Sequence, residues 1–259
     1  MIEFAGGDIT RWVAAHLWPL FRVASFLMAV PFVGARLVPM RIRLGLALLI
    51  TLVILPSVAG GPDIDPLSLP SLYVIFQQVL IGVSLGFLVT LFTQMFVVAG
   101  QIMAMQMGLG FAAMMDPANG VSVPVLSQFF LVTVTLVFLS MNGHLLMIDV
   151  IVTSFHAWPI SASMIDPGAV WAVIHRIVWL FSAALLIALP VSASVFIVNV
   201  SFGVMTRAAP QLNVFALGFP IAQIFGMVLV YVSLNGFLDN FILLLEDTFV
   251  FINRELLGV

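Results

Sequence analysis

The chain is divided into six apolar runs, and several of them are longer than a membrane is thick. The runs cover residues 12–33, 42–59, 72–107, 125–155, 170–205 and 214–245. A helix that crosses a bilayer needs about 20 mainly apolar residues. The third, fifth and sixth runs each exceed 30 residues, which corresponds to about 45 Å of helix at 1.5 Å per residue. The pattern predicts an all-α integral membrane protein with about six long helices joined as hairpins.

The overall composition supports this class and excludes others. Of the 259 residues, 63% are hydrophobic and 7% are charged, whereas a soluble domain carries about 25% charged residues. The net charge is −3 and the chain has no Cys. A nucleic-acid-binding surface would need clustered basic residues, so we expect no nucleic acid partner, and disulfide or thiol chemistry is excluded.

Proline residues fall inside or beside several of these runs. Pro19, Pro31, Pro190 and Pro220 predict kinks in helices that are already too long for the bilayer. Irregular backbone at membrane depth is tolerated only where it is buried in protein or lines a cavity. We therefore expect the chain to be one part of a larger packed assembly.

The few charges predict an orientation. Arg36, Arg41 and Arg43 lie together in the break after the first run. Loops rich in Arg and Lys tend to stay in the cytoplasm. Alternation from that point places the break at Asp166 outside, the break at Arg207 inside, and both termini outside.

Residues 101–128 lie between two long apolar runs and read QIMAMQMGLGFAAMMDPANGVSVPVLSQ. Gly108 and Gly110 each weaken a helix by roughly 1 kcal/mol relative to Ala, and Asp116 and Pro117 form a turn dipeptide. Six of the fourteen Met residues lie within residues 95–115, and Met is flexible enough to re-pack in an irregular gap. Two interpretations stay open here, a gate or plug, and an ordinary loop in which Met fills space.

Three charged residues lie within or at the ends of apolar runs, namely Arg22, Asp149 and Arg176. A charge at the bilayer centre costs at least about 2.5 kcal/mol and usually faces a partner or water. Such residues form either an ion path or pairs between helices or subunits. No helix face carries a chain of acidic residues, so the sequence favours pairs.

No motif in the sequence indicates an enzyme. Residues 82–86 match G-x-S-x-G, but that motif marks a nucleophile only on a strand-to-helix turn, whereas here it lies inside an apolar run. Gly82 and Gly86 instead predict close packing between helices. The His residues have no metal-ligand spacing, and no phosphate loop is present. We expect no catalytic residue, no metal and no cofactor.

Glutamines recur along the third run, at Gln77, Gln78, Gln94, Gln101 and Gln106. Each could form a hydrogen bond between helices, worth roughly 0.6–2 kcal/mol. They could equally line a narrow polar lumen, and the sequence does not choose between these arrangements.

The break at residues 206–213 reads TRAAPQLN and is the most polar of the predicted inner loops. Pro210 stops the fifth run, and Arg207 lies where a cation favours a helix C-terminus. Together with Gln211 and Asn213, these residues form either a plain turn or a docking surface for a partner on the cytoplasmic side.

Four stretches together resemble one family. They are RLVPMRIRLGLALLI, GQIMAMQMGLGFAAMMDPANGVSVPVLSQ, NGHLLMIDVIVTSFHAWPI and TRAAPQLNVFALGFP. The chain is similar over essentially its whole length to the FliR family of flagellar export-gate membrane proteins, called SctT in virulence secretion systems. The Gly-Phe-Pro after the last loop favours the flagellar branch.

This resemblance implies a function, a place and partners. Family members are pore-forming subunits of the flagellar type III export gate in the bacterial inner membrane, at the flagellar basal body. Several copies each of FliP and FliQ complete a helical assembly, FlhB wraps its cytoplasmic side, and exported flagellar proteins pass through it unfolded. The gate is lifted largely out of the bilayer plane, which would explain the overlong runs. The resemblance also implies that the chain contacts membrane lipid.

The resemblance also divides the chain. Residues 1–259 form a single integral membrane unit, in which residues 1–165 resemble FliP and residues 166–259 resemble the FliQ hairpin. The family's plug falls on residues 106–122, and its cytoplasmic loop falls on residues 207–213. The plug positions are Gln106, Met107, Gly108, Gly110, Phe111, Met114, Met115, Asp116 and Pro117.

A different class of function remains as the alternative, namely a secondary transporter or an intramembrane enzyme that works alone. A transporter of this kind is expected to show internal repeats with broken helices at matching positions, and no convincing repeat is visible. An enzyme would need a His beside a nucleophile or metal ligands on facing helices. The sequence favours a gate subunit without enzymatic activity.

Overall fold

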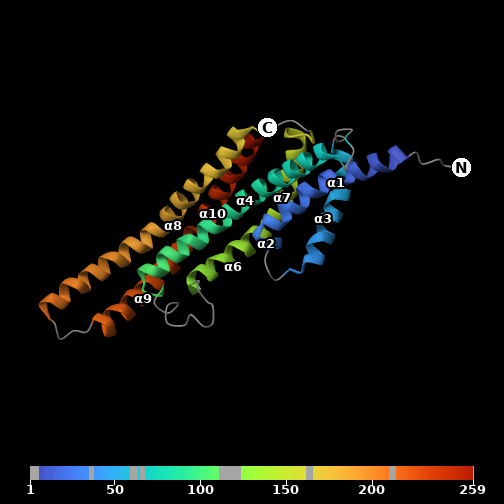
Figure 1. Cartoon of the computed structure of the whole chain (residues 1–259). Coiled ribbons are helices and arrows are strands. Elements are labelled where there is room, and N and C mark those ends of the chain that lie inside the picture. The colour runs from blue at the N-terminus through green and yellow to red at the C-terminus, as the bar shows by residue number, and fades with distance from the viewer. Residues whose placement is uncertain are drawn as a thin grey trace. The chain divides into compact units, whose positions relative to one another are not determined.

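A computed structural model describes residues 6–34, 38–58, 64, 68–110, 124–161, 166–209 and 214–258, and every regular element among them is helical (Figure 1). The predicted all-α class is confirmed. The helices are α1 (Gly6–Ala29), α2 (Pro31–Gly34), α3 (Met40–Ile54), α4 (Leu69–Gln106), α6 (Val125–Ser140), α7 (Gly143–Ala157), α8 (Pro167–Ala208), α9 (Val214–Ser233) and α10 (Phe237–Val250). Short 3₁₀ turns, η1 (Leu55–Ser57) and η3 (Leu234–Gly236), follow α3 and α9, and a π-helical segment, η4 (Phe251–Leu257), ends the described chain.

Four stretches of helix in the described chain are long and apolar enough to cross a membrane. They are Met40–Ser57, Leu69–Gln106, Pro167–Ala208 and Gly218–Leu257, with 18, 38, 42 and 40 residues. At 1.5 Å per residue, α4 and α8 are about 57 Å and 63 Å long. The expectation of helices longer than a bilayer requires is therefore confirmed. Pro190 lies inside α8 and Pro220 inside α9, and neither residue ends its helix.

The sequence pattern predicted one helix for the run at residues 125–155, and this prediction is wrong. The run is divided into α6 and α7, which are bent by 72° at Met141 and Asn142 and would count as a fifth span if taken together. Asn142 has a left-handed backbone with φ 59°, a conformation that Asn adopts more readily than most residues. Gly143 follows it, and a Cβ atom there would lie 2.5 Å from the Phe138 ring. The Asn-Gly pair therefore turns the chain where hydrophobicity alone suggests continuity.

The chain forms two compact units, each assembled from separate segments. The first contains Met1–Leu91, Phe138–Arg176 and Asp247–Val259, and the second contains Phe92–Val137 and Ile177–Glu246. Helices α4 and α8 contribute residues to both units. The division into FliP-like and FliQ-like parts at residue 165 stays a prediction.

Small residues of α4 hold α1 close in the first unit. A Cβ atom at Gly82 would collide with the Arg22 carbonyl and the Ser25 hydroxyl, and one at Gly86 would lie 2.8 Å from the Phe26 carbonyl oxygen. One turn further on, the Thr90 hydroxyl donates a hydrogen bond of 2.7 Å to the Ala29 carbonyl. The G-x-S-x-G match thus lies inside a helix and forms a packing face, as small residues one turn apart do in membrane proteins.

Aromatic rings fill the second unit where α4, α6 and α10 meet. Phe92 and Phe241 pack edge to face with ring centroids 5.2 Å apart. Phe96 lies 5.5 Å from Phe237, and Phe130 of α6 lies 6.0 Å from Phe237. Such contacts add about 0.5–1.5 kcal/mol per pair beyond the burial of the rings.

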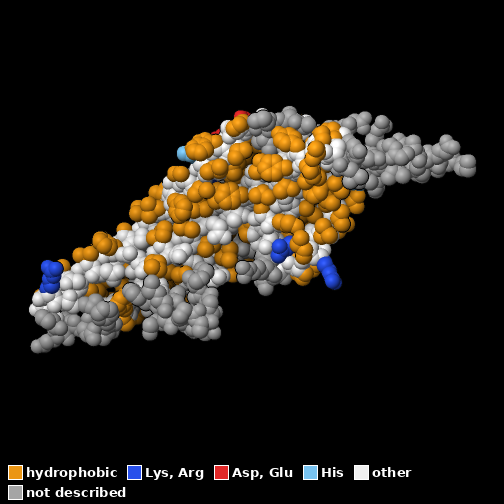
Figure 2. Space-filling view, viewed as in Figure 1, with side chains coloured by type: hydrophobic (Ala, Val, Ile, Leu, Met, Phe, Trp, Pro, Cys, Tyr) orange, Lys and Arg blue, Asp and Glu red, His pale blue; other side chains and the backbone are white. Residues whose placement is uncertain are grey.

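The surfaces of the long helices remain apolar. Exposed large hydrophobic residues occur along α3, α4, α8, α9 and α10, with Leu186 at 70% and Ile224 at 66%. Figure 2 shows hydrophobic side chains spread widely over the described surface in view, with few charged groups among them. Monomeric soluble proteins rarely expose apolar patches of this extent, so these faces require lipid or other protein to cover them.

Candidate functional site

Helix α4 ends inside the candidate plug, and the backbone of Gly108 makes that end possible. Gly108 has φ 79°, a left-handed conformation that Gly adopts at little cost. Its amide donates to the Met105 carbonyl at 3.1 Å, and the Leu109 amide donates to the Ala104 carbonyl at 2.9 Å. These two bonds form a Schellman motif, which commonly closes a helix at a glycine. Gly108 is one of the two glycines that the sequence analysis identified as weakening the helix, and α4 ends beside it.

Side chains and backbone of α8 and α9 contact this helix end. Asn199 of α8 donates a hydrogen bond of 3.1 Å to the Gln106 carbonyl. The Met107 side chain is 1% exposed and lies on Gly226 of α9, where a Cβ atom would be 2.6 Å from Met107 Cγ. The end of α4 and the first two residues of the predicted plug, Gln106 and Met107, are therefore contacted by α8 and α9.

The structure describes only the first part of the predicted plug. Gln106, Met107, Gly108 and Gly110 lie among the described residues, and Gly110 packs on the Met105 side chain. The remaining predicted plug residues lie outside the described residues; they are Phe111, Met114, Met115, Asp116 and Pro117.

Arg22 is fully buried in α1 and is held by neutral acceptors. Its Nε donates to Gln78 Oε1 at 2.8 Å, one Nη donates to the Ser154 carbonyl at 2.8 Å, and the other donates to the Trp158 carbonyl at 2.9 Å. The guanidinium also lies 4.2 Å from the centre of the Phe155 ring. The planar fork of Arg can serve several acceptors at once, which a lysine ammonium cannot do in this geometry.

The acceptors identify what Arg22 does. Ser154 and Trp158 belong to the end of α7, where Trp158 is the C-terminal cap residue. The last carbonyls of a helix carry a partial negative charge, and those beyond the final backbone bond have no partner within the helix. The Ser154 carbonyl also accepts from the Trp158 amide at 3.0 Å, so Arg22 gives it a second bond. Arg22 therefore caps α7 from α1, while Gln78 orients the guanidinium from α4. This is a structural anchor between three helices.

The other two predicted intramembrane charges differ from Arg22. Arg176 of α8 forms an ion pair with Asp247 of α10, and its guanidinium lies 4.4 Å from the centre of the Phe251 ring. Arg176 is thus one half of an ion pair between two helices. Asp149 lies on α7 with an exposed side chain.

The glutamines of α4 do not form one set. Gln77 and Gln78 are buried, at 5% and 0% exposure, and Gln78 binds Arg22. Gln101 is exposed and Gln106 is half-buried. Hydrogen bonding between helices is thus shown for Gln78.

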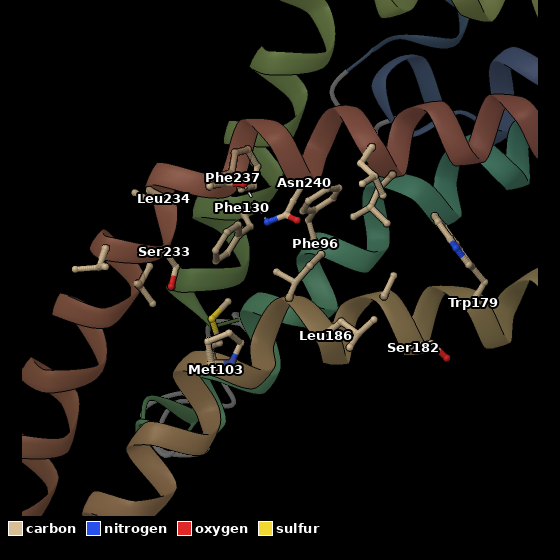
Figure 3. Close-up of a pocket in the computed structure, with 18 residues that line it drawn as sticks. Phe96, Met103, Phe130, Trp179, Ser182, Leu186, Ser233, Leu234, Phe237 and Asn240 are labelled. Atoms are coloured by element: carbon tan, nitrogen blue, oxygen red, sulfur yellow. Dashed lines mark hydrogen bonds between the residues drawn. The ribbon is translucent and has the colours of Figure 1, made fainter.

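The second unit contains a cavity of about 530 Å³ between α4, α6, α8 and the segment from α9 to α10. Its lining is mainly apolar, and Figure 3 shows Phe96, Phe130 and Phe237 gathered at it with Asn240 nearby. Ser182, Ser233 and Asn240 each donate to a backbone carbonyl four residues earlier. The described lining contains no Asp, Glu, His, Lys or Arg. A ligand site usually needs a few converging polar groups, which these internally bonded side chains do not supply.

Metal-binding clusters are likewise not found in the described part of the chain, where no three His, Asp or Glu residues could hold an ion. The predicted docking loop is described only at its start. Arg207 lies in the last turn of α8 with an exposed side chain. Pro210, Gln211 and Asn213 lie outside the described residues.

The sequence analysis did not select Asn199 or Gly226. Asn199 follows an apolar stretch of α8 as the only amide in that helix, and a lone amide at such a position is a usable signal for a hydrogen bond between helices. Gly226 carries no comparable signal, because a glycine in an apolar helix can pack against any neighbour.

The chain resembles known export proteins over almost its full length. Residues 13–248 match the family described as Bacterial export proteins, family 1. The flagellar biosynthetic protein FliR of Escherichia coli K12 is 35% identical over 229 residues, which cover 88% of this chain and 87% of the relative. FliR of Pectobacterium carotovorum is 34% identical over 228 residues, with the same coverage, and FliR of Bacillus subtilis is 29% identical over 224 residues, which cover 85% and 86%.

The long apolar helices define a membrane-embedded protein with several spans. Together with these matches, they establish that the chain belongs to the family of bacterial export proteins that includes FliR. The resemblance seen in the sequence is confirmed, and the chain is a membrane-embedded component of the flagellar export apparatus.

We predict that Arg22→Lys destabilises the protein by about 2 kcal/mol, because a lysine keeps the charge but cannot donate at once to the Trp158 carbonyl, the Ser154 carbonyl and Gln78. The measurement is the unfolding midpoint of the detergent-purified protein. Arg41→Lys serves as the control, since Arg41 is exposed at the start of α3. An unchanged midpoint for Arg22→Lys would show that the charge, rather than its hydrogen bonds, is what the fold needs.

Proposed function

We propose that the chain is a non-enzymatic, pore-forming subunit of the flagellar type III protein export gate in the bacterial inner membrane. In this proposal it assembles with FliP and FliQ, its cytoplasmic end contacts FlhB, and unfolded flagellar proteins cross the membrane through the assembly. Residues 106–122 act as a Met- and Gly-rich plug that closes the channel at rest.

The observation that best supports the plug proposal is the way in which α4 ends. A helix of 38 residues stops at a left-handed glycine while its last residues are fixed by α8 and α9. The sequence that follows is rich in Met, whose side chains can seal a gap and re-pack around a passing chain. A fixed support followed by soft apolar residues has the properties that a closable seal needs.

The apolar surface supports an assembled state. Only 28% of the span window in α8 and 17% of the window in Gly218–Leu257 are buried within the chain. Lipid can cover such faces, but helices well over 30 residues long exceed the roughly 30 Å of hydrocarbon. Neighbouring subunits that surround these helices would account for the surface that lies outside the lipid.

A transporter or intramembrane enzyme that works alone is the competing function, and the native mass separates the two. After mild detergent extraction of the tagged chain, we expect a large hetero-oligomer that contains FliP and FliQ. Mass spectrometry of the intact complex is the measurement. Recovery of an active single chain would overturn the proposal.

The plug proposal predicts that removing the plug makes the membrane leak ions. Deleting residues 110–120 should leave assembly intact, because Gln106 and Met107, which contact Asn199 and Gly226, precede the deleted stretch. The deletion should make the membrane permeable to small ions. Ion conductance of cells that carry the deletion within an otherwise complete gate is the measurement. Met141→Ser is the matched control for loss of Met, since Met141 is 37% exposed at the α6–α7 corner. An assembled deletion variant as tight as the wild type would show that the stretch is a connecting loop.

The docking loop gives a separate prediction. Replacing Arg207 and Gln211 by Ala should lower the recovery of FlhB with the gate by a few-fold, since exposed charge contacts contribute about 0.2–1 kcal/mol each. Recovery of FliP and FliQ should not change. Arg254→Ala is the control, because Arg254 is also exposed but lies outside the loop, near the C-terminal end of the chain. Full recovery of FlhB with both residues replaced would remove the loop's docking role.

A further inference from the structure

We propose that the cavity of the second unit is a binding site for one acyl chain of a membrane lipid. The cavity lies between α4, α6, α8 and the segment from α9 to α10, and all of its described lining residues belong to the second unit. The inference goes beyond the proposed function and does not depend on the plug. It assigns one lipid chain to a defined place inside the protein.

The chemistry of the cavity walls selects a hydrocarbon occupant. The described lining contains no charged residue and no His. Its polar side chains include Ser182, Ser233 and Asn240, and each donates to a backbone carbonyl four residues earlier. A charged or strongly polar ligand would lose its water here without gaining a matching partner. An acyl chain has no hydrogen bonds to lose.

The cavity leads from an exposed apolar rim to a buried apolar floor. On the floor, Phe96, Met103 and Phe130 are 1%, 2% and 4% exposed. On the rim, Leu186 of α8 and Leu243 of α10 are 70% and 63% exposed. Figure 3 shows the Phe rings on one side of the space and α8 with Leu186 on the other. A hydrocarbon chain can therefore enter over the rim without passing a charged group.

The uncharged length of α8 places the cavity at the depth of the lipid chains. No charged residue occurs between Arg176 and Arg207, a stretch of about 45 Å at 1.5 Å per residue. A hydrocarbon layer of about 30 Å that avoids both charges always includes the middle of this stretch. Ile187 and Pro190 lie there, and both line the cavity. The cavity is therefore level with acyl chains wherever such a layer crosses α8.

The size of the cavity matches a single acyl chain. Its volume is about 530 Å³. An apolar cavity of about 150 Å³ holds benzene, which has six carbons, and the same ratio gives this cavity room for roughly twenty carbons. No single protein side chain has that many. An empty space of this size would deprive its walls of dispersion contacts, and one flexible chain restores them.

The test is photo-crosslinking with a lipid. A phosphatidylglycerol that carries a diazirine in the middle of one acyl chain is added to bacterial membranes, where the protein has its natural partners, and to the purified chain in vesicles. After irradiation, mass spectrometry of peptides maps the adducts. We expect adducts on the floor residues Phe96, Met103 or Phe130 in both samples, as well as on Ile224, which is 66% exposed on α9. Lipid on the outer faces alone cannot reach the buried floor.

Two results would overturn the inference. Adducts on Ile224 without adducts on the floor, in both samples, would show that no acyl chain enters the cavity. Floor adducts in vesicles but not in bacterial membranes would show that a partner protein occupies the space in the natural assembly.

Variants that fill the cavity test its role directly. Gly236 lines the cavity, and a Cβ atom there would meet only Asn240 Nδ2, at 3.9 Å. Gly236→Leu should therefore lower the ratio of floor adducts to Ile224 adducts by about five-fold or more, since a side chain and an acyl chain cannot share the space. Gly203→Leu is the matched control and should leave the ratio unchanged, because Gly203 does not line the cavity and a Cβ atom there meets nothing within 4 Å.

A second filling variant comes from the opposite wall. Ala183 of α8 is 5% exposed and lines the cavity, so Ala183→Leu should lower the same ratio and serves if Gly236→Leu does not fold. An unchanged ratio in a folded filling variant would contradict the site.

The headgroup provides the last comparison. A phosphatidylcholine with the same labelled chain should give the same ratio of floor to Ile224 adducts as the phosphatidylglycerol, because the described lining offers no partner to a headgroup charge. Floor adducts with the anionic lipid alone would show that the headgroup, and not the acyl chain, is what the protein recognises.

Discussion

Helix ends that stop inside apolar protein must find donors for their carbonyl groups, and much of this structure follows from that requirement. An unsatisfied buried carbonyl costs about 1–3 kcal/mol, and neither lipid nor an apolar side chain can relieve it. At the partly buried end of α7 the guanidinium of Arg22 donates to the Trp158 carbonyl, and at the more exposed end of α4 the amide of Asn199 donates to the Gln106 carbonyl. Each donor comes from another helix, so capping one helix also fixes its position against a neighbour.

Close packing of backbones is what allows these donors to reach their acceptors. Gly82 lies against the carbonyl of Arg22, so α1 approaches α4 closely at the residue whose side chain binds both Gln78 and the end of α7. Gly226 has the same relation to Met107 at the end of α4. In both places a glycine sets the distance and a polar side chain then satisfies the backbone. A larger residue at either glycine would disturb the polar contact as well as the packing.

The class of the protein and the departure of α4 at Gly108 could be predicted from the sequence, because run length and glycine are directly visible in it. The role of Arg22 could be narrowed to an anchor but not assigned, since its acceptors are backbone carbonyls, and every residue carries one. The break at Asn142 was missed because long apolar stretches on both sides outweighed the Asn142-Gly143 turn dipeptide between them. Asn199 was missed for a related reason, because its partner at Gln106 is also a carbonyl. Hydrogen bonds to the carbonyls at helix ends are thus hard to predict from the types of side chain in the sequence.

The described chain therefore provides donors for the C-terminal ends of α4 and α7 while it leaves many helix faces apolar and uncovered. These two requirements differ in how they can be met. A carbonyl at a buried helix end needs a donor at one place and in one direction, which a fluid surrounding does not provide. An apolar face needs only contact with something apolar, which lipid or a neighbouring helix provides equally well. A subunit that must keep a defined helix end while its surroundings change during assembly would be expected to divide its interactions in this way. The fixed end of α4, held by two residues of α8 and α9, is the place in the second unit where that division is clearest.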